Sequence, residues 1–248
     1  METFRADIAR QIAVVCYKLY DRGYVTALDG NVSARLPNGN ILVTPSAMNK
    51  GKVTESDLVE VKADGTPVTL NRKASTELDM HLFIYAQRQD VNAVVHAHPT
   101  YATGFATARI PLNDRLFPEV IVGLGTIPLA DYATPSTKEV ADSLAPHVRI
   151  ATAILLTNHG AVTYGGDLDE AYYKMEKLEH AAHMQFVARM LGGEKPLTNE
   201  EIEKLRAISK SSYGKEVSPT IGKANAGHVE PTDVEIKQLI REILKERT

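Results

Sequence analysis

The chain has one cysteine and no tryptophan among its 248 residues, and it has no long uncharged apolar run. A single cysteine excludes an intramolecular disulfide and suits a reducing compartment. No segment approaches the roughly 18 apolar residues of a membrane-spanning helix. The first residues include Glu2, Arg5 and Asp7, which do not form the pattern of a signal peptide. We therefore expect a cytoplasmic protein without a membrane partner.

Neither sign of charge dominates the sequence. The chain carries 28 Lys and Arg against 31 Asp and Glu, a net charge of -3, and no basic stripe is present. These features give no support for a nucleic-acid partner. Neither G-x-x-x-x-G-K-[ST] nor G-x-G-x-x-G occurs, so nucleotide binding has no motif behind it. The composition, with 44% hydrophobic and 24% charged residues, is that of an ordinary globular protein.

Hydrophobic periodicity and turn residues indicate alternating helices and strands. Helices are expected over residues 4–22, 77–88, 137–145 and 168–191, and strands over 40–44, 57–62, 91–95, 120–128 and 151–157. Several expected strands follow one another directly. This order favours an α/β fold with a mixed or antiparallel sheet flanked by helices, not a doubly wound nucleotide fold.

The character of the sequence changes after residue 208. Residues 209–231 are rich in Ser, Gly, Lys and Pro and are typical of a flexible linker. Thr232 and Glu235 then form a capping box that predicts an amphipathic helix over 232–248. We expect a body over residues 1–208, followed by this linker and helix. The helix either folds back onto the body or another subunit, or serves as a docking tag.

His96 and His98 follow the apolar run 91–95. Alternate residues of a strand face the same way, so the two imidazoles are expected to project side by side. Histidine is the commonest metal ligand, and two on one strand supply half of a tetrahedral zinc site. The simpler alternative is that both histidines only pack or lie at a wet edge.

Two more residues complete a ligand set. His159 follows the apolar run 153–157, and Glu77 begins an amphipathic segment after Ser75 and Thr76. Three imidazoles and one carboxylate make a plausible catalytic zinc set, with the carboxylate able to leave. Alternatively, His159 caps a turn and Glu77 stabilises a helix N-terminus.

Three small turns carry hydroxyl or amide groups that could hold a phosphate. The turns are Gly30-Asn31-Val32-Ser33, Thr44-Pro45-Ser46-Ala47 and Ser75-Thr76, with Lys50 close to the second. The third opens a helix, where backbone N–H groups and the helix dipole attract anions. Each turn alone is more often a plain cap or loop.

Together these segments resemble the class II aldolase and adducin family, in particular its fuculose-phosphate aldolase branch. Five motifs occur in the family's order: Gly30-Asn31-Val32-Ser33, Ile41-Leu42-Val43-Thr44-Pro45-Ser46, Ser75-Thr76-Glu77, His96-Ala97-His98 and Asn158-His159-Gly160. The resemblance covers about residues 1–208 and implies a three-layer α/β fold with a nine-stranded, largely antiparallel sheet. It also implies a homotetramer with fourfold symmetry and zinc sites near the subunit interfaces.

The resemblance assigns roles to individual residues. It makes His96, His98 and His159 zinc ligands, and Glu77 both a ligand of the resting metal and the acid/base. It places the substrate phosphate at Asn31, Ser46, Ser75 and Thr76, beside the backbone of Gly30 and Ala47. The implied reaction cleaves a ketose 1-phosphate, such as fuculose 1-phosphate, to dihydroxyacetone phosphate and an aldehyde such as lactaldehyde. Zinc, one ion per subunit, is the implied cofactor, although other divalent metals fit the same ligands.

The chain departs from that branch in two places. Phe117 falls nearest to a tyrosine that a neighbouring subunit contributes to protonate the aldehyde-side oxygen, and phenylalanine donates no proton; Glu119 is a nearby acid. Residues beyond 208 are additional, and they resemble the encapsulation peptides that dock enzymes to shell proteins of bacterial microcompartments. Three alternatives share the scaffold: a pentulose-phosphate epimerase, a methylthioribulose-phosphate dehydratase and a non-catalytic adducin-like interaction module.

Overall fold

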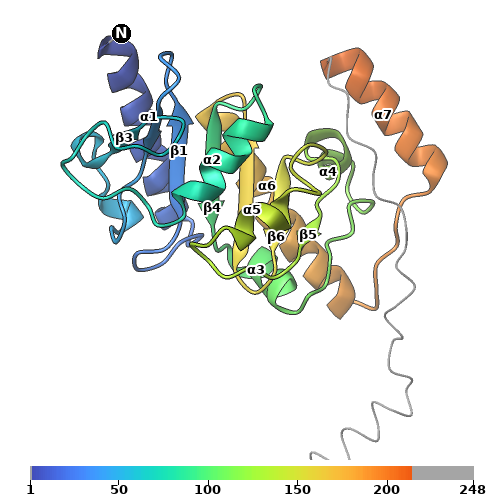
Figure 1. The fold of residues 1–248 in the computed structure, drawn as a ribbon. Coiled ribbons are helices and arrows are strands. Elements are labelled where there is room, and N and C mark those ends of the chain that lie inside the picture. Colours follow the sequence, from blue (N-terminus) through green and yellow to red (C-terminus); the bar gives the residue numbers. More distant parts are fainter. Residues whose placement is uncertain (1, 214–248) are drawn as a thin grey trace, which may run out of the picture.

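A seven-stranded sheet between two layers of helices forms the body of the protein in the computed structural model, which describes residues 2–213 (Figure 1). The strands are β1 (Asn31–Arg35), β2 (Ile41–Val43), β3 (Val59–Val61), β4 (Ala93–Ala97), β5 (Leu129–Ala130), β6 (Ala153–Leu156) and β7 (Gly160–Gly165). The helices are α1 (Glu2–Asp21), α2 (Leu78–Gln87), α3 (Thr100–Thr107), α4 (Pro118–Gly123), α5 (Glu139–Leu144), α6 (Leu168–Met190) and α7 (Asn199–Tyr213). Short 3-10 helices cover Lys50–Lys52 and Glu55–Asp57.

The strand order is β3-β2-β1-β4-β7-β6-β5. Every neighbouring pair is antiparallel except β5 and β6, so the largely antiparallel sheet expected from the sequence is confirmed. The described residues form seven strands in this sheet, not nine. Two further pairings are single bridges, Pro45 with Ala74 and Val61 with Pro67. Each bridge contains a proline, which has no N–H with which to extend a ladder.

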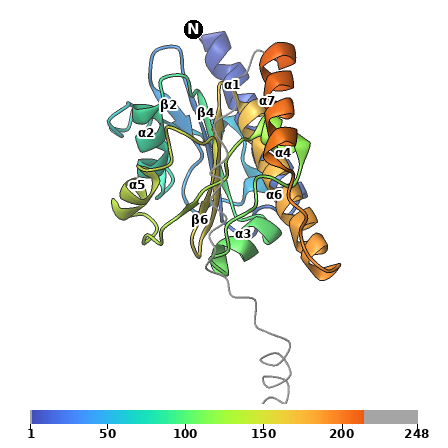
Figure 2. The same cartoon turned by 90° about the vertical axis from the view of Figure 1, so that its right-hand side faces the viewer.

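Each face of the sheet is covered by its own hydrophobic core, because alternate strand residues point to opposite faces. Val95 and Ala97 pack with α1, α3, α4 and α6, whereas Val94 packs with α2 and α5. Figure 2 shows the sheet nearly edge-on, with α2 and α5 on one side and α1, α4 and α6 on the other. The three-layer α/β fold is therefore confirmed, and His96 falls on the α2 face because it shares the parity of Val94.

Most predicted elements form within a few residues of the expected bounds. In α1 the buried stripe of Ile12, Val15 and Leu19 confirms the apolar periodicity, and Cys16 is buried beside it. Burial raises the pKa of the Cys16 thiol to about 12, so the thiol stays protonated. It is a packing residue of the core against α1.

The strand predicted over residues 120–128 is wrong. This segment begins with α4, which has Pro118 at its first position and buries Val120 and Ile121. Proline suits the first helical turn because its missing N–H needs no partner there. Six residues suffice for such a helix when its apolar side is packed against the core.

The predicted boundary between body and linker, after residue 208, falls inside helix α7. Helix α7 runs past residue 208 to Tyr213, and Ser209 on it is buried, so the beginning of the predicted linker 209–231 is helical. The rest of that linker and the predicted helix over 232–248 lie outside the described residues. Among residues 2–213, no helix combines the length and the apolar character needed to cross a membrane.

Candidate metal centre and active site

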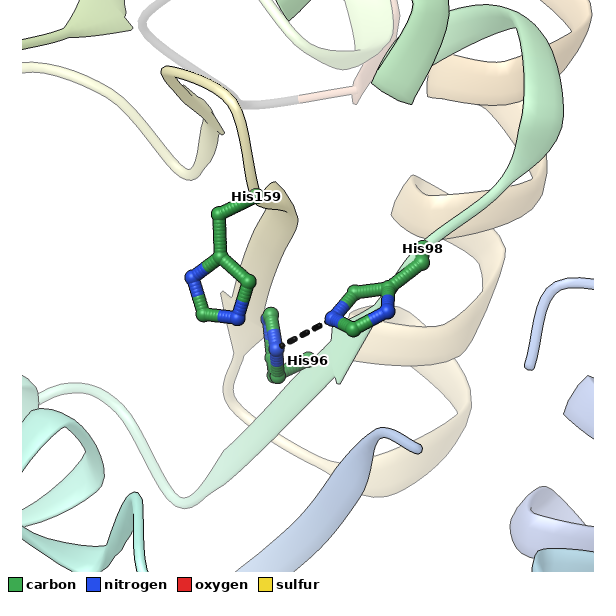
Figure 3. Close-up of side chains that lie close together, drawn as sticks. All are labelled: His96, His98 and His159. Atoms are coloured by element: carbon green, nitrogen blue, oxygen red, sulfur yellow. Dashed lines mark hydrogen bonds between the residues drawn. The ribbon is translucent and has the colours of Figure 1, made fainter. Parts of the chain in front are cut away.

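His96 and His98 project side by side at the end of β4, as the strand periodicity predicts. His96 is the penultimate residue of β4 and is completely buried, and His98 lies just beyond the strand. Their Nε2 atoms are 3.1 Å apart. Figure 3 shows the two rings turned toward one another, with His159 facing them from a separate turn.

The third imidazole comes from the tight turn between β6 and β7. His159 lies in this turn, where Asn158 takes a left-handed conformation with φ of 56°. The ring centroid of His159 lies 4.7 Å from that of His96 and 5.0 Å from that of His98. The three histidines therefore form the cluster that the sequence predicted, and their ligand atoms lie within 4.8 Å of one another.

Two glycines permit this close packing. Gly30, with φ of 72°, leaves room for the carbonyl oxygen of His96, from which a Cβ at position 30 would be 2.9 Å. Gly160 lies against Ala97 and His98 in the same way. Larger residues at either position would force the strand ends apart.

Glu77 completes the cluster from the N-terminus of α2. Its Oε2 lies 3.2 Å from Nε2 of His96, and its Oε1 lies 3.2 Å from Nε2 of His159. Zinc bonds of about 2.0–2.1 Å in a tetrahedron separate neighbouring ligand atoms by about 3.3 Å. Three separations, at 3.1–3.2 Å, are close to that value: Nε2 of His96 to Nε2 of His98, and the two contacts of Glu77. The three imidazoles are therefore able to hold a metal ion, with the Glu77 carboxylate beside it.

Electrostatics favour the metal-binding forms of Glu77 and His98, whereas Glu77 outweighs burial and raises the pKa of His96. Burial alone would raise the pKa of Glu77, but the imidazoles of His96 and His159 outweigh it and hold this pKa well below its usual range. Burial, with the charges of His96 and His159, lowers the pKa of His98 to about 4. An ionised carboxylate and a neutral imidazole are the forms that bind a metal.

A backbone contact fixes the orientation of His96. Its Nδ1 lies 2.9 Å from the carbonyl oxygen of Ala161 on β7. A carbonyl only accepts, so Nδ1–H donates to it, and Nε2 is the nitrogen that faces Glu77 and would present its lone pair to a bound metal. This is the arrangement by which proteins orient metal-binding histidines.

All six predicted phosphate-binding residues line one open pocket beside the cluster. Its lining comprises Leu28, Asp29, Gly30, Asn31, Pro45, Ser46, Ala47, Lys50, Ser75, Thr76, Glu77, His98, Pro135, Ser136 and His159. The pocket thus joins the carboxylate and two imidazoles of the cluster to hydroxyl groups, backbone turns and an ammonium group. Asp29, Pro135 and Ser136 were not singled out from the sequence.

One of the three predicted turns is a strand instead. Asn31, Val32 and Ser33 belong to β1, and only Gly30 has turn geometry. The Asn31 side chain is buried, and its Nδ2 donates to Oε2 of Glu77 at 2.8 Å. Asn31 therefore contacts the carboxylate directly, which the sequence did not indicate.

Lys50 is buried in the lining of this pocket. Its Nζ donates to the carbonyl oxygens of Met48, at 2.6 Å, and Leu28, at 3.2 Å. These bonds join two of the loops that line the pocket. Burial lowers the pKa of Lys50, while the neighbouring Cys16, Asp29 and Glu77 act in the opposite direction.

Phe117 and Glu119, which the sequence comparison set near the family's tyrosine, lie away from this pocket in the described chain. Phe117 precedes α4 and packs against the core on the α1 side of the sheet. Glu119 is exposed, and its backbone carbonyl accepts a hydrogen bond from Nζ of Lys177 at 3.2 Å. Neither residue belongs to the pocket lining of the described chain.

The fold and this pocket agree with a comparison of the sequence with protein families. The family described as "Class II Aldolase and Adducin N-terminal domain" matches residues 10–186. The chain belongs to the class II aldolase and adducin family. Membership of this family supports an aldolase- or lyase-type enzyme. Class II aldolases depend on a metal, and the histidine triad of this chain is able to bind one.

Individual members of the family with different reactions are similar to this chain. An L-fuculose phosphate aldolase of Methanococcus maripaludis is 36% identical over 178 residues, covering 72% of this chain and 95% of the relative. A 3-oxo-tetronate 4-phosphate decarboxylase of Escherichia coli is 35% identical over 208 residues, covering 81% and 96%. A solved structure of L-fuculose 1-phosphate aldolase matches with a TM-score of 0.75 at 32% identity, covering 80% of this chain and 94% of its own.

Proposed function

We propose that the protein is a zinc-dependent aldolase that cleaves a ketose 1-phosphate, such as L-fuculose 1-phosphate, to dihydroxyacetone phosphate and an aldehyde such as lactaldehyde. One observation carries this proposal: the carboxylate of Glu77 contacts two members of a three-imidazole cluster beside a pocket lined with hydroxyl groups and an ammonium group. Such a pocket suits a substrate that has vicinal oxygens at one end and a phosphate at the other.

His96, His98, His159 and, at rest, Glu77 would hold the metal. A bound zinc ion would act as a Lewis acid that stabilises the negative charge left on the three-carbon fragment. Glu77 is the proton-transfer group of the proposal. When the C3–C4 bond breaks, the C4 hydroxyl becomes the aldehyde carbonyl and its proton passes to solvent in the open pocket; the bond's electron pair stays on C3, which gains a proton through Glu77. Asn31 remains hydrogen-bonded to Glu77 and keeps it within reach.

The phosphate would bind on the other side of the pocket. Ser46, Ser75 and Thr76 offer hydroxyl groups, and the last two precede α2, where free N–H groups and the helix dipole attract anions. Lys50 adds a positive charge beside these groups. Binding the unreactive phosphate holds the scissile bond at Glu77 and contributes remote binding energy.

A second candidate is decarboxylation of a 3-oxo acid phosphate, the reaction named for the Escherichia coli relative. Loss of CO₂ from such a β-keto acid leaves the same negatively charged three-carbon fragment as the aldolase reaction. The histidine cluster and the phosphate pocket would therefore serve either reaction. Carbon dioxide departs without proton transfer at an aldehyde oxygen. Phe117, which carries no proton, is compatible with that departure.

The two reactions share the product dihydroxyacetone phosphate and differ in the other fragment. We would therefore assay this product together with aldehyde and CO₂, using fuculose, rhamnulose and 5-deoxyribulose 1-phosphates and 3-oxo-tetronate 4-phosphate. Assays with chelator and with added zinc test the cofactor. Metal-dependent aldehyde release supports the aldolase, and CO₂ release alone supports the decarboxylase. No release from any substrate would contradict both and favour the epimerase or dehydratase alternative.

The remaining expectations concern assembly. We propose that the protein is a homotetramer. We also propose that the segment after α7 docks the enzyme to a microcompartment shell, which would keep a reactive aldehyde product inside. The test is a chain ending at Tyr213, because α7 packs against α4 and belongs to the body. This chain should retain turnover and the oligomeric state and lose binding to shell proteins. Loss of the oligomer and of turnover would support the fold-back alternative.

A further inference from the structure

One face of α2 carries three polar residues spaced four apart, Glu77, His81 and Tyr85, which therefore lie in a row. Only Glu77 belongs to the proposed metal site. His81 is completely buried between α2 and β1, where Nδ1 lies 2.6 Å from Oγ of Ser33. Its Nε2 lies 2.5 Å from Oδ1 of Asn31. Both nitrogens of this buried imidazole are therefore hydrogen-bonded, and one of them is bonded to the residue that contacts Glu77.

The hydrogen-bond directions follow from Glu77. Its carboxylate is ionised and can only accept, so the Asn31 atom that faces it at 2.8 Å must be the NH₂ group. Oδ1 of Asn31 then faces His81 and must accept, which requires a hydrogen on Nε2. With Nε2 protonated in a neutral ring, Nδ1 accepts from the hydroxyl of Ser33.

The direction of the hydrogen bond between Ser33 and Tyr85 follows in the same way. The Ser33 hydrogen is used on His81, so Oγ of Ser33 accepts from the hydroxyl of Tyr85, 2.8 Å away. The chain therefore donates in one direction, from Tyr85 through Ser33, His81 and Asn31 to Glu77. Burial, together with the charge of His96, lowers the pKa of His81 to about 3, which agrees with a neutral ring.

We infer that His81 is a positioning residue of the active site: as the neutral Nε2–H tautomer it holds the Asn31 amide with its NH₂ toward Glu77. This inference rests on the proposed role of Glu77. If His81 carried its hydrogen on Nδ1, Nε2 would be an acceptor and the Asn31 amide would turn over. The carbonyl oxygen of Asn31 would then face the carboxylate, and two acceptors would oppose each other.

A matched pair of amide substitutions separates positioning from packing. His81→Gln places its NH₂ near the original Nε2 and can still donate to Asn31. His81→Asn is shorter, reaching only the Nδ1 position next to Ser33, and cannot. We expect His81→Asn to lower kcat by about 10–100-fold with a smaller change in KM, and His81→Gln to retain most of kcat. Equal losses in both variants at equal stability would overturn the inference.

A double-mutant cycle tests the route of the effect. If His81 acts through Asn31, then His81→Asn should cost little further kcat in an Asn31→Ala background, so the two losses would not add. Additive losses would mean that His81 acts independently of Asn31 and would contradict the proposal. Ser33→Ala serves as a smaller change should the His81 variants fail to fold; it should lower kcat in the same direction, because Nδ1 loses its donor.

The tautomer can be observed without any turnover. Two-bond ¹H–¹⁵N spectra of the full-length protein distinguish the two neutral forms of histidine, and the His81 signals are those that disappear in His81→Gln. We expect the Nε2–H form, unchanged between about pH 6 and 8, where an ordinary histidine titrates. An Nδ1–H form or a charged ring would overturn the inference. Because this measurement needs no substrate, it remains decisive even if the proposed reaction is not found.

Discussion

Gly160 lies so close to His98 that a Cβ on residue 160 would stand 2.5 Å from Cδ2 of that imidazole and 2.5 Å from the carbonyl oxygen of Ala97. The first residue of β7 thus leaves the space that His98, just beyond the end of β4, occupies. A hydrogen at this position is therefore a requirement of the metal cluster as well as of the turn.

Gly160→Ala should displace His98 and weaken metal binding, and it should cost about 1–3 kcal/mol of stability through overpacking. The measurements are the metal-to-protein ratio after dialysis against a fixed zinc concentration and the free energy of unfolding. Gly104→Ala is the matched control, because a Cβ there meets no atom within 4 Å and the position lies inside α3. It should gain about 0.5–1 kcal/mol and leave metal binding unchanged. Full metal occupancy in Gly160→Ala would contradict the crowding argument.

Glu77→Gln should reduce kcat by about 10²–10⁴-fold, because an amide cannot exchange a proton as the carboxylate does. The three histidines remain, so metal content should stay near that of the unchanged protein. Glu119→Gln is the control: Glu119 is the acid nearest to Phe117 in the sequence, and it is exposed on α4. Should Glu119→Gln abolish turnover while Glu77→Gln retains it, the assignment of the acid/base is wrong.

Removal of metal should lower the melting temperature, and added zinc should restore it. A ligand that binds only the folded state stabilises it by about 2.7 kcal/mol at a hundredfold excess over its Kd. His98→Ala should abolish this response because it removes one of the three nitrogens. His183→Ala is the control, since His183 stacks on Tyr101 with ring centroids 3.9 Å apart and does not belong to the cluster. An equal zinc response in both variants would place the metal elsewhere.

Glu60 on β3 should make stability depend on pH in the acid range. Burial would raise its pKa, but hydrogen bonds from Asn40, Arg5 and Asn38 outweigh it and hold the pKa below its usual range. A depressed folded pKa adds stability above the unfolded pKa of about 4.3, and this stability is lost as pH falls through the folded value.

Glu60→Gln should therefore cost about 1 kcal/mol at neutral pH, a small value because Arg5 is partly exposed. The difference from the unchanged protein should shrink as the pH falls below about 4. Denaturant unfolding at neutral and acid pH measures it. A difference that stays constant across this range would mean that the carboxylate charge contributes nothing.

The histidine cluster could be predicted because its signals are local. His96 and His98 are separated by one residue on a buried strand, so strand periodicity alone directs them to one side. His159 directly follows another apolar run, and Glu77 precedes an amphipathic one. Strand ends and helix starts are the positions from which side chains reach a common site, and the resemblance placed them in order.

The hydrogen-bond chain behind Glu77 was not predicted, because its signals depend on pairing between distant segments. Asn31 and Ser33 follow a glycine and are polar, which indicated a turn. They are strand residues whose polar side faces α2 instead of solvent, and their register against β4 decides this. His81 and Tyr85 do carry a usable signal, since both lie on the helical face of Glu77.

The strand predicted over residues 120–128 was wrong for a different reason. Its apolar residues fit a short buried helix and a buried strand equally well, and periodicity cannot separate the two over so few residues. Pro118 was the informative residue, because it is common at the first position of a helix and rare inside strands. Tertiary packing of Val120 and Ile121 then selects the helix.

The order of the central strands has a consequence for how the protein is made. Strand β7 lies between β4 and β6, and His159 immediately precedes it. A growing chain that has emerged from the ribosome as far as α5 contains Glu77, His96 and His98 and lacks the third imidazole. The complete ligand set can form only after β7 has inserted beside β4. In the proposed metal site, contact of one ion with all four side chains would therefore come only after β7 has paired with β4.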